Sequence, residues 1–594
     1  MSFEKLSSYQ KLPEYLRSYV VEQNYAHYTA REHATWRYIM RNAREFFREH
    51  AHQVYLDGLE KSGIPVDRIP EIEEMDRVLN QFGWGALCVC GFIPPLAFLE
   101  FQSLKILPIA ADMRTLEHIA YTPAPDIVHE AAGHAPILAD RDYAEYLTRY
   151  ANLARHAIFS AEDIRLYEAI RILSDTKENP DSGEDDIEKA ESGLRTVISQ
   201  MSWVSEAARV ARMNWWTAEY GLVGEAECPK IYGAGLLSSL AESRSCLADS
   251  VQKIPLSLKC IEQTYDITKP QPQLYVARDF RQLTEVLEEL ESTMSFKKGG
   301  LYGLGVARQS RAVSSVVFDS GLTVSGVLES FQSVDDQLSF IRWSGPVQLS
   351  QGRTQLADHG SSRHPSGFSS PIGAWTYEPK IHPSELTDQQ LAEAGLLPGK
   401  LAEIKTLAGF LICGRLLRIR RTDEGRLCLL TWDGCRVSRG DEDFFRPEWG
   451  EFDMLVASAV PSVYGGPADI DHYPERDFGR TSTNPGRQRP YDDAELKLFN
   501  LYQQLRDFRR SPLRGEALLA ALEPLAQLLE AEYPQEWLAL VELAELLRQK
   551  AGLDEMTVPW FSRLNHFLQG QDSGLDDLQR GFMKDGLLRA GTPD

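Results

Sequence analysis

Two histidines and a distant glutamate are the residues of this chain best suited to bind a metal ion. His129 and His134 lie five residues apart in Pro-Asp-Ile-Val-His-Glu-Ala-Ala-Gly-His-Ala-Pro, and Glu219 lies in Trp-Trp-Thr-Ala-Glu-Tyr-Gly. Two imidazoles and one carboxylate leave coordination positions open, which suits an iron(II) ion that must admit oxygen. The run 214–223 around Glu219 is apolar, and a carboxylate there is costly unless it is paired or bound to a metal.

The spacing of the two histidines constrains the segment that carries them. Residues five apart on a straight α-helix point about 140° away from each other, so both imidazoles could not reach one ion. We therefore expect the helix to bend or end between His129 and His134. Gly133 and Pro136 supply such a break, because glycine tolerates unusual backbone angles and proline interrupts helical hydrogen bonding.

Two other classes of function use the same residues. A zinc hydrolase would bind its metal through His129 and His134 and use Glu130 as the base. The histidines of the zincin motif are four apart, so the spacing here counts against that class. A non-catalytic scaffold is the third class, and the intact set with Glu219 counts against it.

Three ordered motifs carry a resemblance to a known family. They are residues 121–134 (Tyr-Thr-Pro-Ala-Pro-Asp-Ile-Val-His-Glu-Ala-Ala-Gly-His), residues 219–221 (Glu-Tyr-Gly), and residues 232–239 (Tyr-Gly-Ala-Gly-Leu-Leu-Ser-Ser) with Glu242. With these motifs the chain resembles the pterin-dependent aromatic amino acid hydroxylases, and is most similar to the bacterial phenylalanine 4-hydroxylase branch in a long form with a C-terminal extension. The likeness covers roughly residues 15–290.

The resemblance implies roles for individual residues. Arg114 would grip the amino acid carboxylate, for which a guanidinium fork is chemically suited, although an ordinary ion pair with Asp112 or Glu117 is the alternative. The remaining implied roles follow the family pattern: iron(II) ligands His129, His134 and Glu219; substrate contacts Arg114, Thr122, Pro125, Trp215 and Ser238; and residues near tetrahydrobiopterin, Phe98, Glu130 and Glu242.

The activity that the resemblance implies is aromatic ring hydroxylation. It would use O2, tetrahydrobiopterin and a mononuclear non-heme iron(II), with phenylalanine converted to tyrosine as the expected reaction. Tryptophan as the substrate, or hydroxylation at the meta position, stays open because the shape of the pocket decides it.

The chain is expected to fold into several domains, since 594 residues exceed one ordinary domain. We expect a mainly α catalytic domain over 1–294, a β-rich domain of unknown role over 295–480 and a helical region over 490–594. The middle part has short β-like runs, and Asp433-Gly434 between two of them predicts a hairpin turn. Leucines at helical spacing beyond residue 492 predict a small bundle, or a surface through which the chain forms a homo-oligomer.

Two polar segments are predicted to be loops. Lys177 to Ser192 is acidic, and the family is expected to have fewer residues at this point of the chain. We interpret the segment as a solvated loop, with a lid over the active site as the alternative. The stretch 351–373 is rich in Gly, Ser, His and Pro. His359, His364 and His382 in or near it have no fixed ligand spacing, so we interpret them as loop residues rather than as a second metal site.

The composition restricts the partners and the location of the protein. A net charge of -23 argues against binding to nucleic acids or anionic membranes, because both would repel the chain. No stretch is long and apolar enough to span a bilayer, and the first residues do not have the pattern of a signal peptide. We therefore expect a cytoplasmic enzyme.

Overall fold

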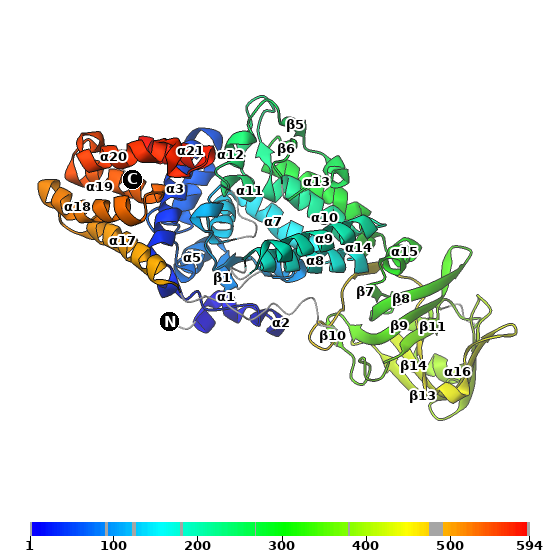
Figure 1. Ribbon diagram of the computed structural model, residues 1–594. Helices are drawn as coiled ribbons and strands as arrows, with labels where there is room; N and C mark the ends of the chain where they lie inside the picture. Colours follow the sequence, from blue (N-terminus) through cyan, green and yellow to red (C-terminus); the bar gives the residue numbers. More distant parts are fainter. Residues whose placement is uncertain are drawn as a thin grey trace.

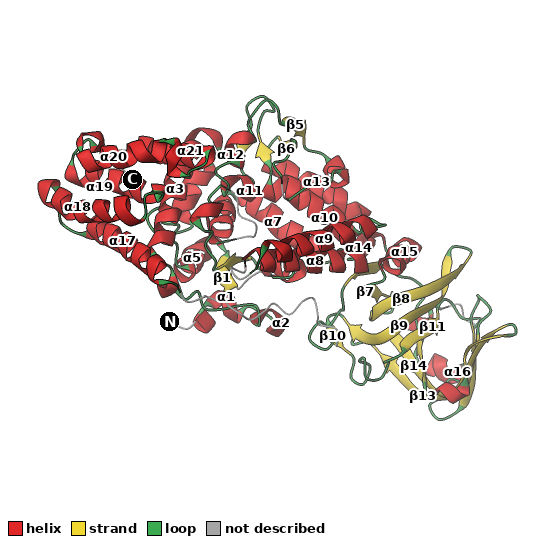
Figure 2. Cartoon of the chain, viewed as in Figure 1, coloured by secondary structure: helices red, strands yellow, loops and turns green. Residues whose placement is uncertain are grey.

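The computed structural model describes residues 3–89, 93–120, 126–178, 182–267, 269–377, 381–473 and 491–590. Figure 1 shows an elongated molecule in which the N-terminal and C-terminal helices form one large body and the middle of the chain forms β-sheets at the opposite end. Figure 2 shows that most helices lie in the large body and most strands at the opposite end. Among the helices lie β1 (Gly85–Val89), β5 (Gln252–Pro255) and β6 (Gln273–Ala277), and among the strands lies α16 (Asp388–Glu393). Helices at both ends of the chain and strands in the middle agree with the predicted fold class.

The N-terminal part of the helical body is built around α3 (Ala30–His50). Thr29 and Glu32 form a capping box that starts this helix, and its buried residues lie on more than one side. The other helices of this part are α1 (Ser7–Gln10), α2 (Glu14–Arg17), α4 (Val54–Lys61), α5 (Ile72–Leu79), α6 (Pro95–Ser103), α7 (Arg141–Ala154), α8 (Ala161–Glu178), α9 (Glu184–Gln200), α10 (Glu206–Asn214), α11 (Ala234–Leu237), α12 (Glu242–Ser245), α13 (Phe280–Thr293), α14 (Ser295–Lys298) and α15 (Gly300–Ser310).

Two small sheets accompany these helices. In the first, β1 (Gly85–Val89) pairs in parallel with β2 (Ile106–Ala110). The second has the order β4-β3-β6-β5, with bounds Lys230–Ile231, Leu222–Val223, Gln273–Ala277 and Gln252–Pro255.

The acidic segment from Lys177 to Ser192 is helical over most of its length, so the predicted solvated loop is wrong. It forms the end of α8 and the first half of α9, which pack against each other as a hairpin (Figure 1). Three acidic residues, Glu184, Asp185 and Asp186, occupy the first turn of α9. Carboxylates are favourable there because the N-terminal end of a helix carries a partial positive charge.

The β-rich part consists of two antiparallel sheets. The first has the order β10-β9-β8-β7-β17 with β11 paired to β9, and the second has the order β12-β13-β14-β15 with β16 paired to β14. The strand bounds are β7 (Val313–Val317), β8 (Leu322–Val334), β9 (Gln337–Gln351), β10 (Thr354–Gln355), β11 (Gly367–Pro371), β12 (Leu401–Lys405), β13 (Leu411–Arg421), β14 (Leu427–Arg439), β15 (Glu442–Phe445), β16 (Phe452–Leu455) and β17 (Ser462–Gly465), with the short α16 (Asp388–Glu393) before β12.

The predicted hairpin turn at Asp433-Gly434 is wrong, because β14 continues through it. The register between β13 and β14 shifts there, and Gly434 has a φ of 56°, as expected for a β-bulge. The tight turn of the first sheet lies instead at Asp335-Asp336, between β8 and β9, where both residues have positive φ.

The C-terminal helices pack onto α3 and share the hydrophobic core of the N-terminal helices. Their predicted leucine stripes are largely buried in this core, including Leu505, Leu522 and Val541. Burial within the chain favours the bundle over an oligomer surface, and oligomer formation stays a prediction. The helices are α17 (Asp493–Arg510), α18 (Gly515–Glu532), α19 (Trp537–Leu546), α20 (Pro559–Gln569) and α21 (Asp577–Arg589).

Buried ion pairs join the two parts. Arg37 of α3 pairs with Glu542 of α19, and Arg509 of α17 donates to Glu542 at 2.9 Å and to Glu545 at 2.7 Å. Burial raises the pKa of Glu542, but the charges of Arg37 and Arg509 outweigh it and lower this pKa to about 2. Glu542 is therefore ionised in the folded chain.

Within the parts of the chain that the structure describes, no helix is long and apolar enough to cross a membrane.

Candidate metal centre and substrate site

The two histidines lie in a π-helix that runs from Val128 to His134. A π-helix is wider than an α-helix and closes its hydrogen bonds between residues five apart, so residues at that spacing lie on one face. The imidazole centroids of His129 and His134 are 5.0 Å apart. The helix widens where we expected it to bend. Pro136 begins the 3₁₀ turn that follows, Pro136–Ala139.

Glu219 ends a second π-helix, Trp215–Glu219, which directly follows α10. Its Oε2 lies 3.3 Å from Nε2 of His129, and its Oε1 lies 3.3 Å from Nε2 of His134. The side chain of His134 is 2% exposed, whereas those of His129 and Glu219 are 16% and 15% exposed. The cluster is thus closed on the His134 side and open to small molecules beside the other two.

The polar atoms of the cluster suit a bound metal ion. Both ring nitrogens of His134 are buried, and neither makes a hydrogen bond within the described part of the chain. Nδ1 of His129, by contrast, lies 3.1 Å from Oγ of Ser238, and Nδ2 of Asn214 donates to Oε1 of Glu219 at 3.2 Å. Buried imidazole nitrogens that make no hydrogen bond are costly. A divalent ion at Nε2 of His134 would remove part of that cost.

The electrostatics of Glu219 agree with this interpretation. Burial raises its pKa, but His134 and His129 lower it more strongly, so the pKa lies well below the usual range of a glutamate. The residue is therefore an ionised carboxylate between two imidazoles. This is the charge state in which a carboxylate binds a metal.

Two glycines allow the three sequence motifs to meet. A Cβ on Gly133 would lie 2.7 Å from the carbonyl oxygen of Ala234, and one on Gly233 would lie 2.4 Å from the carbonyl oxygen of Glu219. Any larger residue would therefore push the histidine segment away from α11, or α11 away from Glu219. The role of Gly133 is close packing rather than a break in the helix.

Glu130 lies beside the cluster, and Glu242 contacts Tyr220, the residue that follows Glu219. A carboxylate oxygen of Glu130 lies within 4.8 Å of ring nitrogens of His129 and His134, yet its Oε2 is buried and makes no hydrogen bond in the described structure. Burial raises the pKa of Glu130 to about 8. Glu242 accepts a hydrogen bond of 2.8 Å from the hydroxyl of Tyr220, and burial raises its pKa. Glu219 contacts both histidines and is the better ligand candidate.

Arg114 is held by Asp126 rather than by Asp112 or Glu117. Its Nε donates to Oδ2 of Asp126 at 2.7 Å and its Nη2 donates to Oδ1 at 2.8 Å, while Nη1 donates to the carbonyl of Ser238 at 2.8 Å. Burial raises the pKa of Asp126, but the charge and hydrogen bonds of Arg114 outweigh it, and this pKa is lowered.

The structure places Trp215 and Phe98, the two aromatic residues predicted for the site, in different surroundings. Trp215 stacks between Tyr265, with ring centroids 4.2 Å apart, and Tyr220, with centroids 4.5 Å apart. Tyr265 was not predicted, because nothing in its sequence neighbourhood distinguishes it from a core aromatic. Phe98 on α6 packs against a separate cluster that contains Leu16 and Phe101. Thr122 and Pro125 lie outside the described residues.

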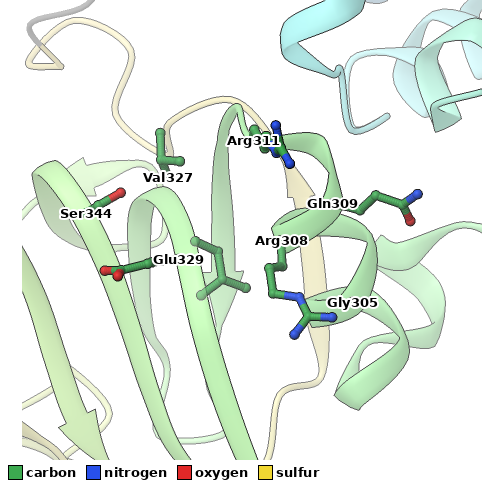
Figure 3. Close-up of a pocket in the computed structure, with 8 residues that line it drawn as sticks. Gly305, Arg308, Gln309, Arg311, Val327, Glu329 and Ser344 are labelled. Atoms are coloured by element: carbon green, nitrogen blue, oxygen red, sulfur yellow. The ribbon is translucent and has the colours of Figure 1, made fainter. Parts of the chain in front are cut away.

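A large open cleft lies elsewhere, between α15 and β8. Its volume is about 620 Å³, and Arg308, Arg311 and Glu329 are among its lining residues (Figure 3). It lies on the β-rich part of the chain and has charged groups of both signs. The histidine and glutamate cluster is therefore the better candidate for redox chemistry.

Comparison with known proteins agrees with the geometry. Residues 14–158 and 196–301 match the family described as biopterin-dependent aromatic amino acid hydroxylase. The chain is 28% identical to phenylalanine-4-hydroxylase of Pseudomonas aeruginosa over 281 residues, which cover 47% of this chain and 90% of the relative. It is 28% identical to the enzyme of the same name from Mesorhizobium japonicum over 274 residues, 46% of this chain and 83% of the relative.

A crystal structure of Chromobacterium violaceum phenylalanine hydroxylase with iron and phenylalanine bound is 24% identical, with a TM-score of 0.35 over 46% of this chain and 86% of that one. The gap in the family match, between residues 158 and 196, contains α8 and most of α9. The helical hairpin is therefore an addition to the family pattern. Residues 14–158 and 196–301 are thus similar to the biopterin-dependent aromatic amino acid hydroxylases.

Proposed function

We propose that the region from residue 14 to residue 301 converts L-phenylalanine to L-tyrosine with O2 and tetrahydrobiopterin, at an iron(II) ion held by His129, His134 and Glu219. The observation that carries the proposal is the 3.3 Å approach of each Nε2 atom to an oxygen of the same carboxylate. When bound, iron and reduced pterin supply the activation of O2 and the transfer of one oxygen atom to the aromatic ring. The protein must then orient the ring and exclude water.

Arg114 is proposed to bind the carboxylate of the substrate. A guanidinium has five N–H donors, and the contacts to Asp126 and Ser238 use three of them. One donor is left on Nη1 and one on Nη2, which is the pair needed for a two-point contact with a carboxylate. Because Asp126 fixes the plane of the guanidinium, the substrate would bind in one orientation.

Ser238 joins the substrate side of the site to the metal side. Its carbonyl accepts from Arg114, and its hydroxyl lies 3.1 Å from Nδ1 of His129. If His129 carries a proton on Nδ1, it donates to this hydroxyl and leaves Nε2 free for the metal. Ser238 would then hold Arg114, the proposed binding group for the substrate carboxylate, and the metal ligand His129 at a fixed separation.

Trp215 is proposed as one wall of the pocket for the aromatic ring. Its stacking between Tyr220 and Tyr265 covers both faces of the indole and holds it in one plane, so an edge of the indole would contact the substrate ring. Thr122 and Pro125 are proposed, from the family resemblance, to complete this part of the site. Phe98, Glu130 and Glu242 are proposed to lie on the pterin side. We also propose the division of the chain at residues 1–294, 295–480 and 490–594.

Product analysis tests the proposal. The iron(II)-loaded full chain would be incubated with O2, a tetrahydropterin and, in separate reactions, phenylalanine, tryptophan or tyrosine, followed by mass spectrometry. We expect tyrosine from phenylalanine, and no product from His134→Ala. A matched control is His156→Ala, which removes a half-buried histidine outside the cluster. 5-Hydroxytryptophan or meta-tyrosine as the main product would contradict the substrate or the ring position. No hydroxylated product despite bound iron would contradict the function.

A further inference from the structure

Two histidines predicted to be loop residues meet an aspartate in the β-rich part of the chain. His359 and His364 lie between β10 and β11, and Asp453 lies in β16 of the other sheet. All three residues are buried, with side chains 4%, 9% and 3% exposed. Burial of two imidazoles and a carboxylate at one point requires a compensating interaction.

Backbone hydrogen bonds fix the loop that carries the histidines. Leu349 of β9 donates to the carbonyl of His359 at 2.9 Å, and Val347 of β9 donates to the carbonyl of His364 at 3.0 Å. Both histidines are thus anchored to the same strand. These backbone hydrogen bonds therefore position both histidine side chains next to β16.

The three polar atoms have the separations of a metal ligand set. Nδ1 of His359 lies 3.4 Å from Nε2 of His364, and these two nitrogens lie 3.8 and 3.9 Å from Oδ2 of Asp453. Zinc binds nitrogen and carboxylate oxygen at about 2.0 to 2.2 Å, so the ligand atoms of a tetrahedral zinc site lie about 3.3 to 3.6 Å from one another. The three separations here are close to this range, and shifts of a few tenths of an ångström in the side chains would complete the site.

The charge states of the three groups also suit a cation. Burial lowers the pKa of His364 to about 4 and lowers that of His359, so both imidazoles are neutral at pH 7 and keep a lone pair. Burial raises the pKa of Asp453, but the hydrogen bonds of Arg363 and Thr431 lower it more, so the residue is an ionised carboxylate.

The surroundings of Asp453 resemble those of a metal-binding carboxylate. Thr431 donates to Oδ1 at 2.7 Å, and Arg363 donates from Nε to Oδ2 at 2.8 Å. Hydrogen bonds of this kind orient carboxylate ligands in metal sites. Glu451 accepts from Arg363 at 2.8 Å and offsets its positive charge next to the site.

We propose that His359, His364 and Asp453 bind a divalent transition-metal ion, with zinc as the ion of best fit and water in the fourth position. Two imidazoles and one carboxylate are ligands that zinc accepts in tetrahedral sites. The ion fastens the loop 356–366 to the sheet that contains β16, and so joins the two sheets of the β-rich part. This site is separate from the proposed hydroxylation site and does not depend on its function.

Zinc stoichiometry of the full chain tests the site. Chelator-stripped protein would be dialysed against zinc and analysed by mass spectrometry for metal, together with His134→Ala, His364→Gln and the double variant. Since zinc also binds two histidines and a glutamate, we expect two ions per chain in the wild type, one in each single variant and none in the double variant. A wild-type content in His364→Gln, or no zinc in His134→Ala, would overturn the proposal.

Cobalt supplies a second measurement, whose first step needs no change in the β-rich part. In His134→Ala, Co²⁺ should give the intense visible absorption of a tetrahedral site, and no such band would overturn the proposal. We expect His364→Gln in the same background to lose the band. The matched control is His382→Gln, which removes a histidine that lies 3.0 Å from Asp319 outside the cluster and should keep it. A band that persists in His364→Gln, or one that disappears in His382→Gln, would contradict the assignment.

Discussion

Asp126 holds the guanidinium of Arg114 through two parallel hydrogen bonds, at 2.7 and 2.8 Å. Both side chains are buried, at 5% and 1% exposed. The pair therefore sets the direction of the remaining donors of Arg114 before any substrate arrives. The same aspartate accepts a hydrogen bond of 3.0 Å from the backbone N–H of His129. Asp126 therefore positions both Arg114 and the histidine segment.

The first prediction concerns this pair. Asp126→Asn keeps the size of the side chain but removes its charge, so Arg114 loses a charge-assisted contact worth about 1.5 to 3 kcal/mol. We expect kcat/KM for the amino acid to fall about tenfold to a hundredfold, mainly through KM. Steady-state kinetics with fixed pterin measure the effect. Glu117→Gln, on the neighbouring exposed acid, is the control, and an equal effect there would contradict the assignment.

Ser238→Ala tests the link between the metal and substrate sides. It removes the hydroxyl near His129 and leaves the carbonyl that Arg114 uses. Loss of such a partner of a ligating histidine weakens metal binding about tenfold to a hundredfold. Iron(II) titration measures the affinity. Ser245→Ala, whose hydroxyl bonds only to the carbonyl of Glu242 among the contacts described, should leave it unchanged.

Gly133→Ala tests the close approach of the motifs. The new methyl group would lie 2.7 Å from the carbonyl oxygen of Ala234, and overpacking of this kind costs about 1 to 3 kcal/mol. We expect a lower Tm together with weaker iron binding. Gly193→Ala on α9 has open space around the new methyl and should be neutral or stabilising. Equal Tm values for the two variants would refute the packing argument.

The buried charges between α3 and α19 predict a pH effect. The pKa of Glu542 is about 2 in the folded chain and about 4.3 in an unfolded one. The stability that it contributes is present above pH 4.3 and is lost as the pH falls towards 2, because protonation then favours the unfolded chain. The free energy of unfolding, measured by circular dichroism, should fall less steeply between pH 4.3 and pH 2 in Glu542→Gln than in the wild type.

The same variant should be destabilised at neutral pH. Removal of one partner of a buried ion pair costs about 3 to 5 kcal/mol, since Arg37 and Arg509 would stay buried without a full counter-charge. Denaturant unfolding at pH 7 measures the change. Glu530→Gln breaks the exposed pair with Arg563 and should cost about 0 to 1 kcal/mol. A loss in Glu542→Gln no larger than in Glu530→Gln would contradict the prediction.

Much of the fold follows from the sequence because hydrophobic periodicity is a local signal. The N-terminal part of the chain was predicted to be mainly α-helical, the leucine stripes after residue 492 were predicted as helices, and the middle of the chain was predicted to be β-rich. The spacing of His129 and His134 indicated a distorted helix. It did not indicate the π-helix, because widening and bending both bring residues five apart towards one ion, and only the backbone hydrogen bonds distinguish them.

Features that depend on distant contacts were not predictable. Asp433-Gly434 has the composition of a turn, but pairing of β14 with β13 on both sides of it makes a bulge. His359 and His364 have no ligand spacing along the chain, and Asp453, which completes their cluster, lies in another sheet. The acidic residues after Gly183 were assigned to a loop because their charge was weighed above their favourable position at a helix start.

The shared core of α3 and the C-terminal helices has a consequence for synthesis on the ribosome. α3 is translated before the β-rich part, whereas Glu542, the carboxylate partner of Arg37, is translated after it. The nascent N-terminal helices therefore carry an incomplete core until the C-terminal helices are made. Premature termination between the β-rich part and α17 would release a chain that contains all three sequence motifs and still exposes the face of α3 that the C-terminal helices cover.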